Sequence, residues 1–129
     1  MCLKNYKGKF FSRYWRRNYD HTQKLLTHSK INSQKVVDSL LPRKDVDGFH
    51  SLNYGRMARG LPAHVPATPL GILRLLEHYG VETAGKHCVI VGRGNTVGAP
   101  LSILMGSNRS SGNATVTVCH KHSKNINML

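Results

Sequence analysis

Three glycines, Gly92, Gly94 and Gly98, could bring the backbone close to a phosphate group. They lie in the segment Gly-Arg-Gly-Asn-Thr-Val-Gly, directly after one apolar run and before another. Glycines between a strand and a helix let backbone N–H groups and the helix N-terminus face an anion. The dinucleotide pattern G-x-G-x-x-G would need glycine at 97, where the chain has Val97. The segment therefore indicates a nucleotide-binding loop, but an ordinary strand-to-helix turn also fits it.

Basic side chains gather at the end of the next apolar run. His120, Lys121, His122 and Lys124 follow that run, and Arg93 lies within the glycine segment. A site for NAD usually carries an acidic residue here to bind the ribose 2′-hydroxyl, whereas cations suit a 2′-phosphate. We therefore expect NADP as the cofactor. The expected binding residues are Gly92, Arg93, Gly94, Gly98, His120 and Lys121.

The polar segment from Lys44 to His50, Lys-Asp-Val-Asp-Gly-Phe-His, is predicted to be a loop that carries function. Its two carboxylates, Asp45 and Asp47, could work as an acid/base pair. A loop aspartate can also simply satisfy the backbone of its own turn. The residues alone leave these alternatives open.

No metal centre, serine or cysteine nucleophile, or membrane span is expected. The histidines and cysteines lack C-x-x-C or H-E-x-x-H spacing, and no G-x-S-x-G is present. No apolar run approaches the roughly 20 residues that cross a bilayer. Three cysteines cannot all pair, which favours free thiols and a cytoplasmic location.

Periodicity predicts an α/β fold around the glycine segment. A helix is expected over 69–79, with Thr68 as N-cap, Pro69 as the first helical residue and Gly80 as the stop. Strands are expected over 87–91 and 114–119, joined by a helix over 100–105. Strand, glycine loop, helix and strand form a βαβ unit, whose strands are parallel.

The segments before this unit are less regular. A short helix is expected after Asn32 or Ser33, with Pro42 ending it. Residues 51–67 contain two glycines and two prolines, so connectors and one turn of helix are expected there.

The order of these motifs resembles the bifunctional methylenetetrahydrofolate dehydrogenase/methenyltetrahydrofolate cyclohydrolase family. The resemblance covers roughly residues 31–125. It is carried by Asp-Val-Asp-Gly-Phe-His (45–50), Ala-Thr-Pro-x-Gly-Ile (67–72), Val-Gly-Arg-x-Asn-x-Val-Gly-x-Pro (91–100) and Ala-Thr-Val-Thr-Val-Cys-His (114–120). The resemblance implies a partial Rossmann-like βαβ NADP-binding unit (69–129), joined to a remnant of the catalytic folate-binding domain (31–68). The chain would then be a fragment that spans the domain junction.

The resemblance also implies a function in one-carbon folate metabolism, which serves purine biosynthesis. Members of the family are multifunctional enzymes, both oxidoreductase and hydrolase. They oxidise 5,10-methylenetetrahydrofolate with NADP and hydrolyse 5,10-methenyltetrahydrofolate to 10-formyltetrahydrofolate. Asp47 would contact the pterin ring of the tetrahydrofolate derivative, Arg93 would hold the 2′-phosphate, and a homodimer is expected.

Several positions depart from the family pattern. The family's catalytic lysine lies in a Tyr-x-x-x-Lys helix that this sequence lacks, and Lys24 aligns with a glutamine that assists catalysis. No catalytic residue is therefore assigned, and impaired activity is expected. The family usually has Ser where Gly94 stands and a small hydroxyl residue where Lys121 stands. The alternative is a non-catalytic binding module with weak NADP affinity.

Residues 1–30 have no counterpart in the family. The whole chain has 129 residues and a net charge of +13. This segment carries eight basic residues and one acid, together with six of the nine aromatic residues. Such a segment could bind nucleic acid through phosphate contacts and base stacking. We expect instead that it is an extension unrelated to the family, with no nucleic-acid partner.

Overall fold

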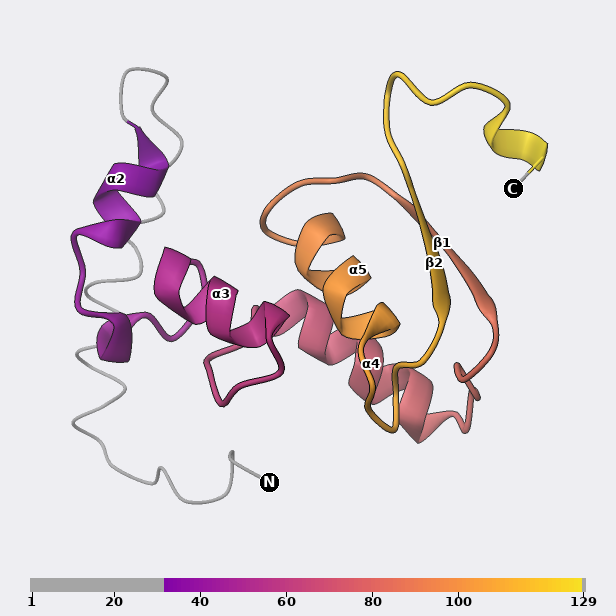
Figure 1. Ribbon diagram of the computed structural model, residues 1–129, viewed down its shortest axis with the longest axis horizontal. Helices are drawn as coiled ribbons and strands as arrows, with labels where there is room; N and C mark the ends of the chain where they lie inside the picture. Colours follow the sequence, from indigo (N-terminus) through magenta and orange to yellow (C-terminus); the bar gives the residue numbers. More distant parts are fainter. Residues whose placement is uncertain (1–31, 129) are drawn as a thin grey trace. The chain divides into compact units, whose positions relative to one another are not determined.

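The structure is a computed structural model that describes residues 32–128 (Figure 1). The chain divides into two units between Ser39 and Leu40. The described part of the first unit holds helix α2 (Ser33–Asp38), and Asn32 caps it by accepting a 3.1 Å hydrogen bond from the Lys35 N–H. This confirms the predicted cap, although the helix ends before Pro42. The predictions about residues 1–30 fall outside the described residues.

The second unit confirms the predicted βαβ arrangement. Its two strands are parallel neighbours, with Val89 opposite Thr117. Two short 3-10 segments, η1 and η2, flank the other elements. In chain order the elements are η1 (Pro42–Lys44), α3 (Ser51–Ala58), α4 (Ala67–His78), β1 (His87–Val91), α5 (Gly98–Gly106), β2 (Thr115–Cys119) and η2 (Ile126–Met128).

Helix α5 occupies the centre of this unit. It contacts α3, α4 and both strands (Figure 1). Five of its nine residues are buried, among them Leu101, Leu104 and Met105. The core consists of Met57, Leu73, Ile90, Leu101, Leu104 and Met105. Because α5 connects the carboxyl end of β1 to the amino end of β2, this packing fixes the loop between β1 and α5 at one edge of the sheet.

Helix α4 begins earlier than predicted. Its N-cap is Pro66, which makes no side-chain capping bond, and Thr68 lies within the first turn. The prediction of Thr68 as N-cap was therefore wrong. Pro69 is tolerated at the third helical position because N–H groups in the first turn have no partner within the helix. Gly80 has a φ of 65° and follows the end of the helix, as predicted.

Helix α3 occupies a region where connectors and one turn of helix were predicted. It runs over eight residues despite the glycine in its interior. The His50 side chain caps it by accepting a 3.0 Å hydrogen bond from the Leu52 N–H, and Met57 is buried in the core. Burial of a side chain the size of Met57 outweighs the roughly 1 kcal/mol cost of Gly55 in a helix.

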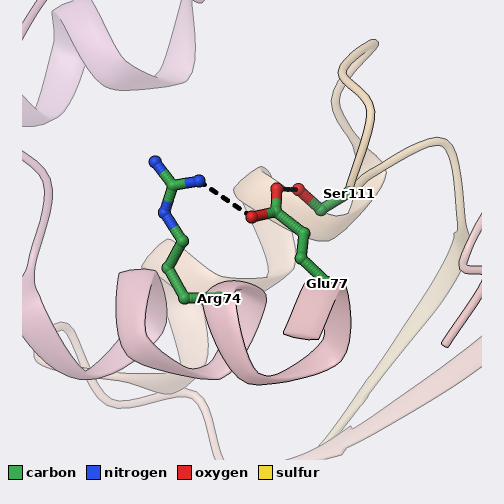
Figure 2. Close-up of polar contacts among 3 residues, drawn as sticks. All are labelled: Arg74, Glu77 and Ser111. Carbon is green, nitrogen blue, oxygen red and sulfur yellow. Dashed lines mark hydrogen bonds and ion pairs between the residues drawn. The ribbon is translucent and has the colours of Figure 1, made fainter. Parts of the chain in front are cut away.

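Polar bonds fasten the end of α4 to the loop that follows α5. The Ser111 hydroxyl donates to the Glu77 carboxylate, which also pairs with Arg74 at 2.8 Å (Figure 2). Thr83 adds a 2.8 Å hydrogen bond from its hydroxyl to the carbonyl of Gly112. The Ser111 bond, followed by the contacts with Arg74, lowers the pKa of Glu77 below its ordinary value.

Replacing Glu77 with glutamine is expected to weaken the acid sensitivity of the fold. Since the pKa is lowered on folding, ionised Glu77 stabilises the protein above the unfolded-state pKa of about 4.5. This contribution is lost as the pH falls through the folded-state value. Thermal melts at neutral pH and at pH 3 should therefore differ less for Glu77→Gln than for the wild type. Glu82→Gln, at an exposed position, is the matched control, and an unchanged difference for Glu77→Gln would contradict the assignment.

Candidate nucleotide-binding site

The carboxyl ends of β1 and β2 bring the predicted binding segments to one edge of the sheet. The Gly92 N–H, directly after β1, donates a 2.7 Å hydrogen bond to the carbonyl of Cys119, the last residue of β2. The glycine segment and His120 therefore start from neighbouring points. Ligands of open α/β sheets bind at this edge, beyond the carboxyl ends of the strands.

Gly98 packs against the start of its own loop. A Cβ atom at this position would lie 2.1 Å from the Gly92 carbonyl oxygen and 2.7 Å from the carbonyl carbon. In the G-x-G-x-x-G pattern, the third glycine permits this close packing between helix and strand. Gly98 fills that role although it lies one residue later than the pattern requires. The extra residue, Val97, forms the N-cap of α5.

The other two glycines meet different requirements. Gly92 has a φ of 127°, a conformation that side-chain-bearing residues rarely adopt. Gly94 lies at an open position, since a Cβ there would meet nothing within 4 Å. A serine, as the family usually has, would fit at Gly94 without disturbing the loop.

The glycine loop contains backbone donors that the described part of the protein leaves without a partner. Among the described residues, the N–H groups of residues 93–96 donate to no protein acceptor. The Gly94 carbonyl turns inward and accepts a 3.0 Å hydrogen bond from the Ala99 N–H at the start of α5. Open N–H groups beside a helix N-terminus suit an anion. This loop, which we call the cradle, therefore has the donors that an anion requires.

The predicted cations flank this cradle. The Arg93 side chain is exposed in the glycine loop. The Lys121 and His122 side chains are exposed in a turn directly after β2, and His120 is half-buried there. The His120 and His122 rings lie edge to face, with centroids 6.0 Å apart. The structure thus brings the glycine loop and the basic turn to one edge, through the Gly92–Cys119 hydrogen bond.

The loop that carries Asp45 and Asp47 lies between η1 and α3, apart from the glycine loop in the chain. Asp45 is buried, and its carboxylate accepts hydrogen bonds from the Phe49 N–H (3.1 Å), the His50 N–H (2.9 Å) and the Asn53 side chain (2.8 Å). Asp45 therefore satisfies the backbone of its own loop. An acid/base role for it would break these bonds.

Asp47 has a different environment in the same loop. It is half-buried, and among the described residues no hydrogen bond to its carboxylate is observed. Burial, and then the negative charge of Asp45, raise its pKa above the ordinary value. A partly desolvated carboxylate without a protein donor is suited to accept hydrogen bonds from a ligand.

Two residues that shape this loop were missed from the sequence. Asn53 bridges Asp45 to the Pro42 carbonyl, which accepts a 2.8 Å hydrogen bond from its amide. Gly48 has a φ of 71°, and a Cβ there would lie 2.5 Å from the His64 carbonyl oxygen. The sequence showed that the segment around Asp45 is polar and contains a glycine. It did not show which of the two carboxylates the loop would enclose.

Within residues 32–128, no group of three or more His, Cys, Asp or Glu side chains is placed to hold a metal ion. The helices in this part of the chain are too short or too polar to span a bilayer.

Comparison with protein families identifies the domain that contains the glycine loop. Residues 66–129 match the model described as the NAD(P)-binding domain of tetrahydrofolate dehydrogenase/cyclohydrolase. The chain is 66% identical over 96 residues to the Bifunctional protein FolD of Amoebophilus asiaticus, covering 74% of this chain and 32% of that protein. It is 55% identical over 96 residues to the Bifunctional protein FolD of Bacteroides fragilis, covering 74% and 33%.

Solved structures agree with this assignment. The 5,10-methylenetetrahydrofolate dehydrogenase of Bombyx mori aligns with a TM-score of 0.71 and 32% identity, over 84% of this chain and 44% of that one. The bifunctional dehydrogenase/cyclohydrolase of Thermoplasma acidophilum aligns with a TM-score of 0.69 and 31% identity, over 78% and 35%. The chain spans about a third of the length of its curated relatives. It belongs to the tetrahydrofolate dehydrogenase/cyclohydrolase family, as its motifs predicted.

Proposed function

We propose that this chain binds NADP at the carboxyl edge of β1 and β2 and serves the oxidation of 5,10-methylenetetrahydrofolate. The contact of Gly98 with the Gly92 carbonyl is the main support, because it brings the α5 N-terminus against the loop whose N–H groups at residues 93–96 donate to no acceptor among the described residues. The family's NAD(P)-binding domain supports the cofactor class. The cations at positions 93 and 121, together with the imidazole of His120, favour the form with a 2′-phosphate.

In this proposal the protein contributes binding and orientation. The outward N–H groups of the glycine loop hold the pyrophosphate, while Arg93 and Lys121 neutralise the 2′-phosphate. The bound cofactor supplies the hydride acceptor. Gly92 and Gly98 give the loop its shape, and Gly94 lies at its open position.

The proposal places the folate substrate at the loop of Asp47. Its carboxylate can accept hydrogen bonds from two neighbouring N–H groups of a pterin ring. Asp45 and Asn53 hold the loop in shape without contacting the substrate. The second activity of the family, methenyl hydrolysis, is expected to be impaired in this chain, because the sequence contains no Tyr-x-x-x-Lys.

We further propose the domain division at residues 68 and 69, with a remnant of the folate-binding domain before it and the NADP-binding unit after it. The family match begins close to this point, at residue 66. A homodimer and a cytoplasmic location complete the proposal, by similarity to the family.

Replacing Arg93 with glutamine is expected to weaken NADP⁺ binding by about tenfold, because one charge-assisted contact with the 2′-phosphate is lost. NAD⁺ binding should change by less than about twofold, since NAD⁺ lacks that phosphate. Calorimetric titration of the whole chain with each nucleotide measures both effects.

Lys86→Gln provides a matched control for the loss of one positive charge. Lys86 is exposed before β1, at the opposite end of the strands from the site. Its replacement should leave both affinities unchanged. Equal losses of NADP⁺ affinity in the two variants would show a general charge effect and contradict a specific role for Arg93.

A further inference from the structure

The basic turn after β2 is closed by two hydrogen bonds between the same two residues. The Ser123 N–H donates to the His120 carbonyl at 2.8 Å, which makes residues 120–123 a β-turn. In the opposite direction, the His120 N–H donates to the Ser123 hydroxyl oxygen at 2.9 Å. Ser123 therefore closes the turn with both its backbone and its side chain.

A third bond orders the tip of this turn. The His122 N–H donates to His120 Nδ1 at 3.2 Å, so the neutral His120 ring carries its proton on Nε2. Lys121 and His122 occupy the two central positions of the turn, where their side chains are exposed. The Ser123 side chain is half-buried and has no charge of its own.

The turn is also fixed to the glycine loop. Cys119, the residue before the turn, is buried, and its carbonyl accepts the hydrogen bond from the Gly92 N–H. Lys121 is therefore connected to the cradle through the Gly92–Cys119 hydrogen bond and the backbone of Cys119 and His120. A change in the turn would move its cations relative to the cradle while leaving the cradle in place.

From this geometry we propose that Ser123 is a positioning residue for 2′-phosphate recognition. The inference rests on the proposed function, because it assumes that the cations of this turn bind NADP. Ser123 does not contact the phosphate. Its hydroxyl oxygen accepts the His120 N–H and so fixes the turn that carries Lys121 and His122 beside the cradle.

Ser123→Ala is expected to leave the His120 N–H without its acceptor and to loosen the turn. The matched ligands 2′,5′-ADP and 5′-AMP isolate the consequence, because they differ only in the 2′-phosphate. Affinity for 2′,5′-ADP should fall about fivefold, the usual effect of losing one hydrogen bond. Affinity for 5′-AMP should stay within about twofold of wild type. Ser123→Thr keeps a hydroxyl oxygen at the same position and should restore the wild-type preference.

Ser107→Ala is the structural control. The Ser107 hydroxyl donates to the Leu104 carbonyl at 2.8 Å just after α5, at the other end of the strands from the turn. Its replacement removes a similar bond and should leave the preference for 2′,5′-ADP unchanged. Amide hydrogen exchange at residues 120 and 123 gives a ligand-free readout. Protection there should fall in Ser123→Ala and return in Ser123→Thr.

The outcomes separate the two proposals. A wild-type chain that binds 2′,5′-ADP no better than 5′-AMP overturns both the NADP assignment and the role of Ser123. A wild-type preference that Ser123→Ala retains overturns the role of Ser123 alone and leaves the NADP assignment standing. A preference lost in Ser123→Ala, restored in Ser123→Thr and kept in Ser107→Ala supports the inference.

Discussion

Replacing Gly98 with alanine is expected to lower NADP⁺ affinity by about 30-fold. The added Cβ would lie 2.1 Å from the Gly92 carbonyl oxygen, so the α5 N-terminus and the loop must move apart. Overpacking of this kind typically costs about 2 kcal/mol, and the displaced N–H groups no longer converge on the pyrophosphate. Titration with NADP⁺ measures the loss, and a thermal melt of the same variant reports the accompanying destabilisation.

Gly71→Ala is the matched control for this prediction. Gly71 lies within α4 at an exposed position, and a Cβ there would meet nothing within 4 Å. Alanine should stabilise the helix by up to about 1 kcal/mol and leave NADP⁺ affinity unchanged. If Gly98→Ala binds NADP⁺ as tightly as Gly71→Ala does, the close packing of α5 on the loop is not required for binding.

Replacing Asp45 with alanine is expected to destabilise the protein by about 3 kcal/mol. The variant leaves the N–H groups of Phe49 and His50 and the amide of Asn53 without their common acceptor, in a loop whose residues 45–50 are buried or half-buried. Denaturant unfolding followed by circular dichroism measures the loss.

Asp47→Asn tests the neighbouring carboxylate in the same loop and should have the opposite effect on stability. The pKa of Asp47 is raised on folding, so its charge costs free energy in the folded state. The folded protein is favoured at pH values below the unfolded-state pKa, and this advantage is lost as the pH rises through the folded-state pKa. At neutral pH, Asp47→Asn should therefore be at least as stable as the wild type and should lose affinity for tetrahydrofolate. A variant of Asp47 as unstable as Asp45→Ala would contradict the division of roles.

The βαβ unit was predictable from sequence because its signals are local. Each strand is a short apolar run, and the glycines and Pro100 mark the loop and the helix start between them. Helix α3 was not predictable in the same way, because its stability depends on packing Met57 against residues distant in the chain. The prediction of Thr68 as a cap failed because the chain enters α4 at Pro66, which makes no side-chain capping bond.

Part of the candidate site could be predicted from residue type, and part required geometry. Spacing alone counted Val97 against the dinucleotide pattern, whereas the contact between Gly98 and Gly92 shows that the extra residue is accommodated before α5. Asp45 and Asp47 are chemically identical in sequence. Only the direction of the loop backbone distinguishes the carboxylate that the loop encloses from the one to which no protein donor is observed among the described residues.

The most direct test of the central claim is a parallel titration of the 129-residue chain with NADP⁺, NAD⁺ and a short oligonucleotide at two salt concentrations. The proposed site predicts saturable binding of one NADP⁺ per chain, at least about tenfold tighter than NAD⁺, since the 2′-phosphate adds charge-assisted contacts. Equal affinity for the two dinucleotides would contradict the role of the cations. Strongly salt-dependent oligonucleotide binding without any response to NADP⁺ would contradict the nucleotide site itself.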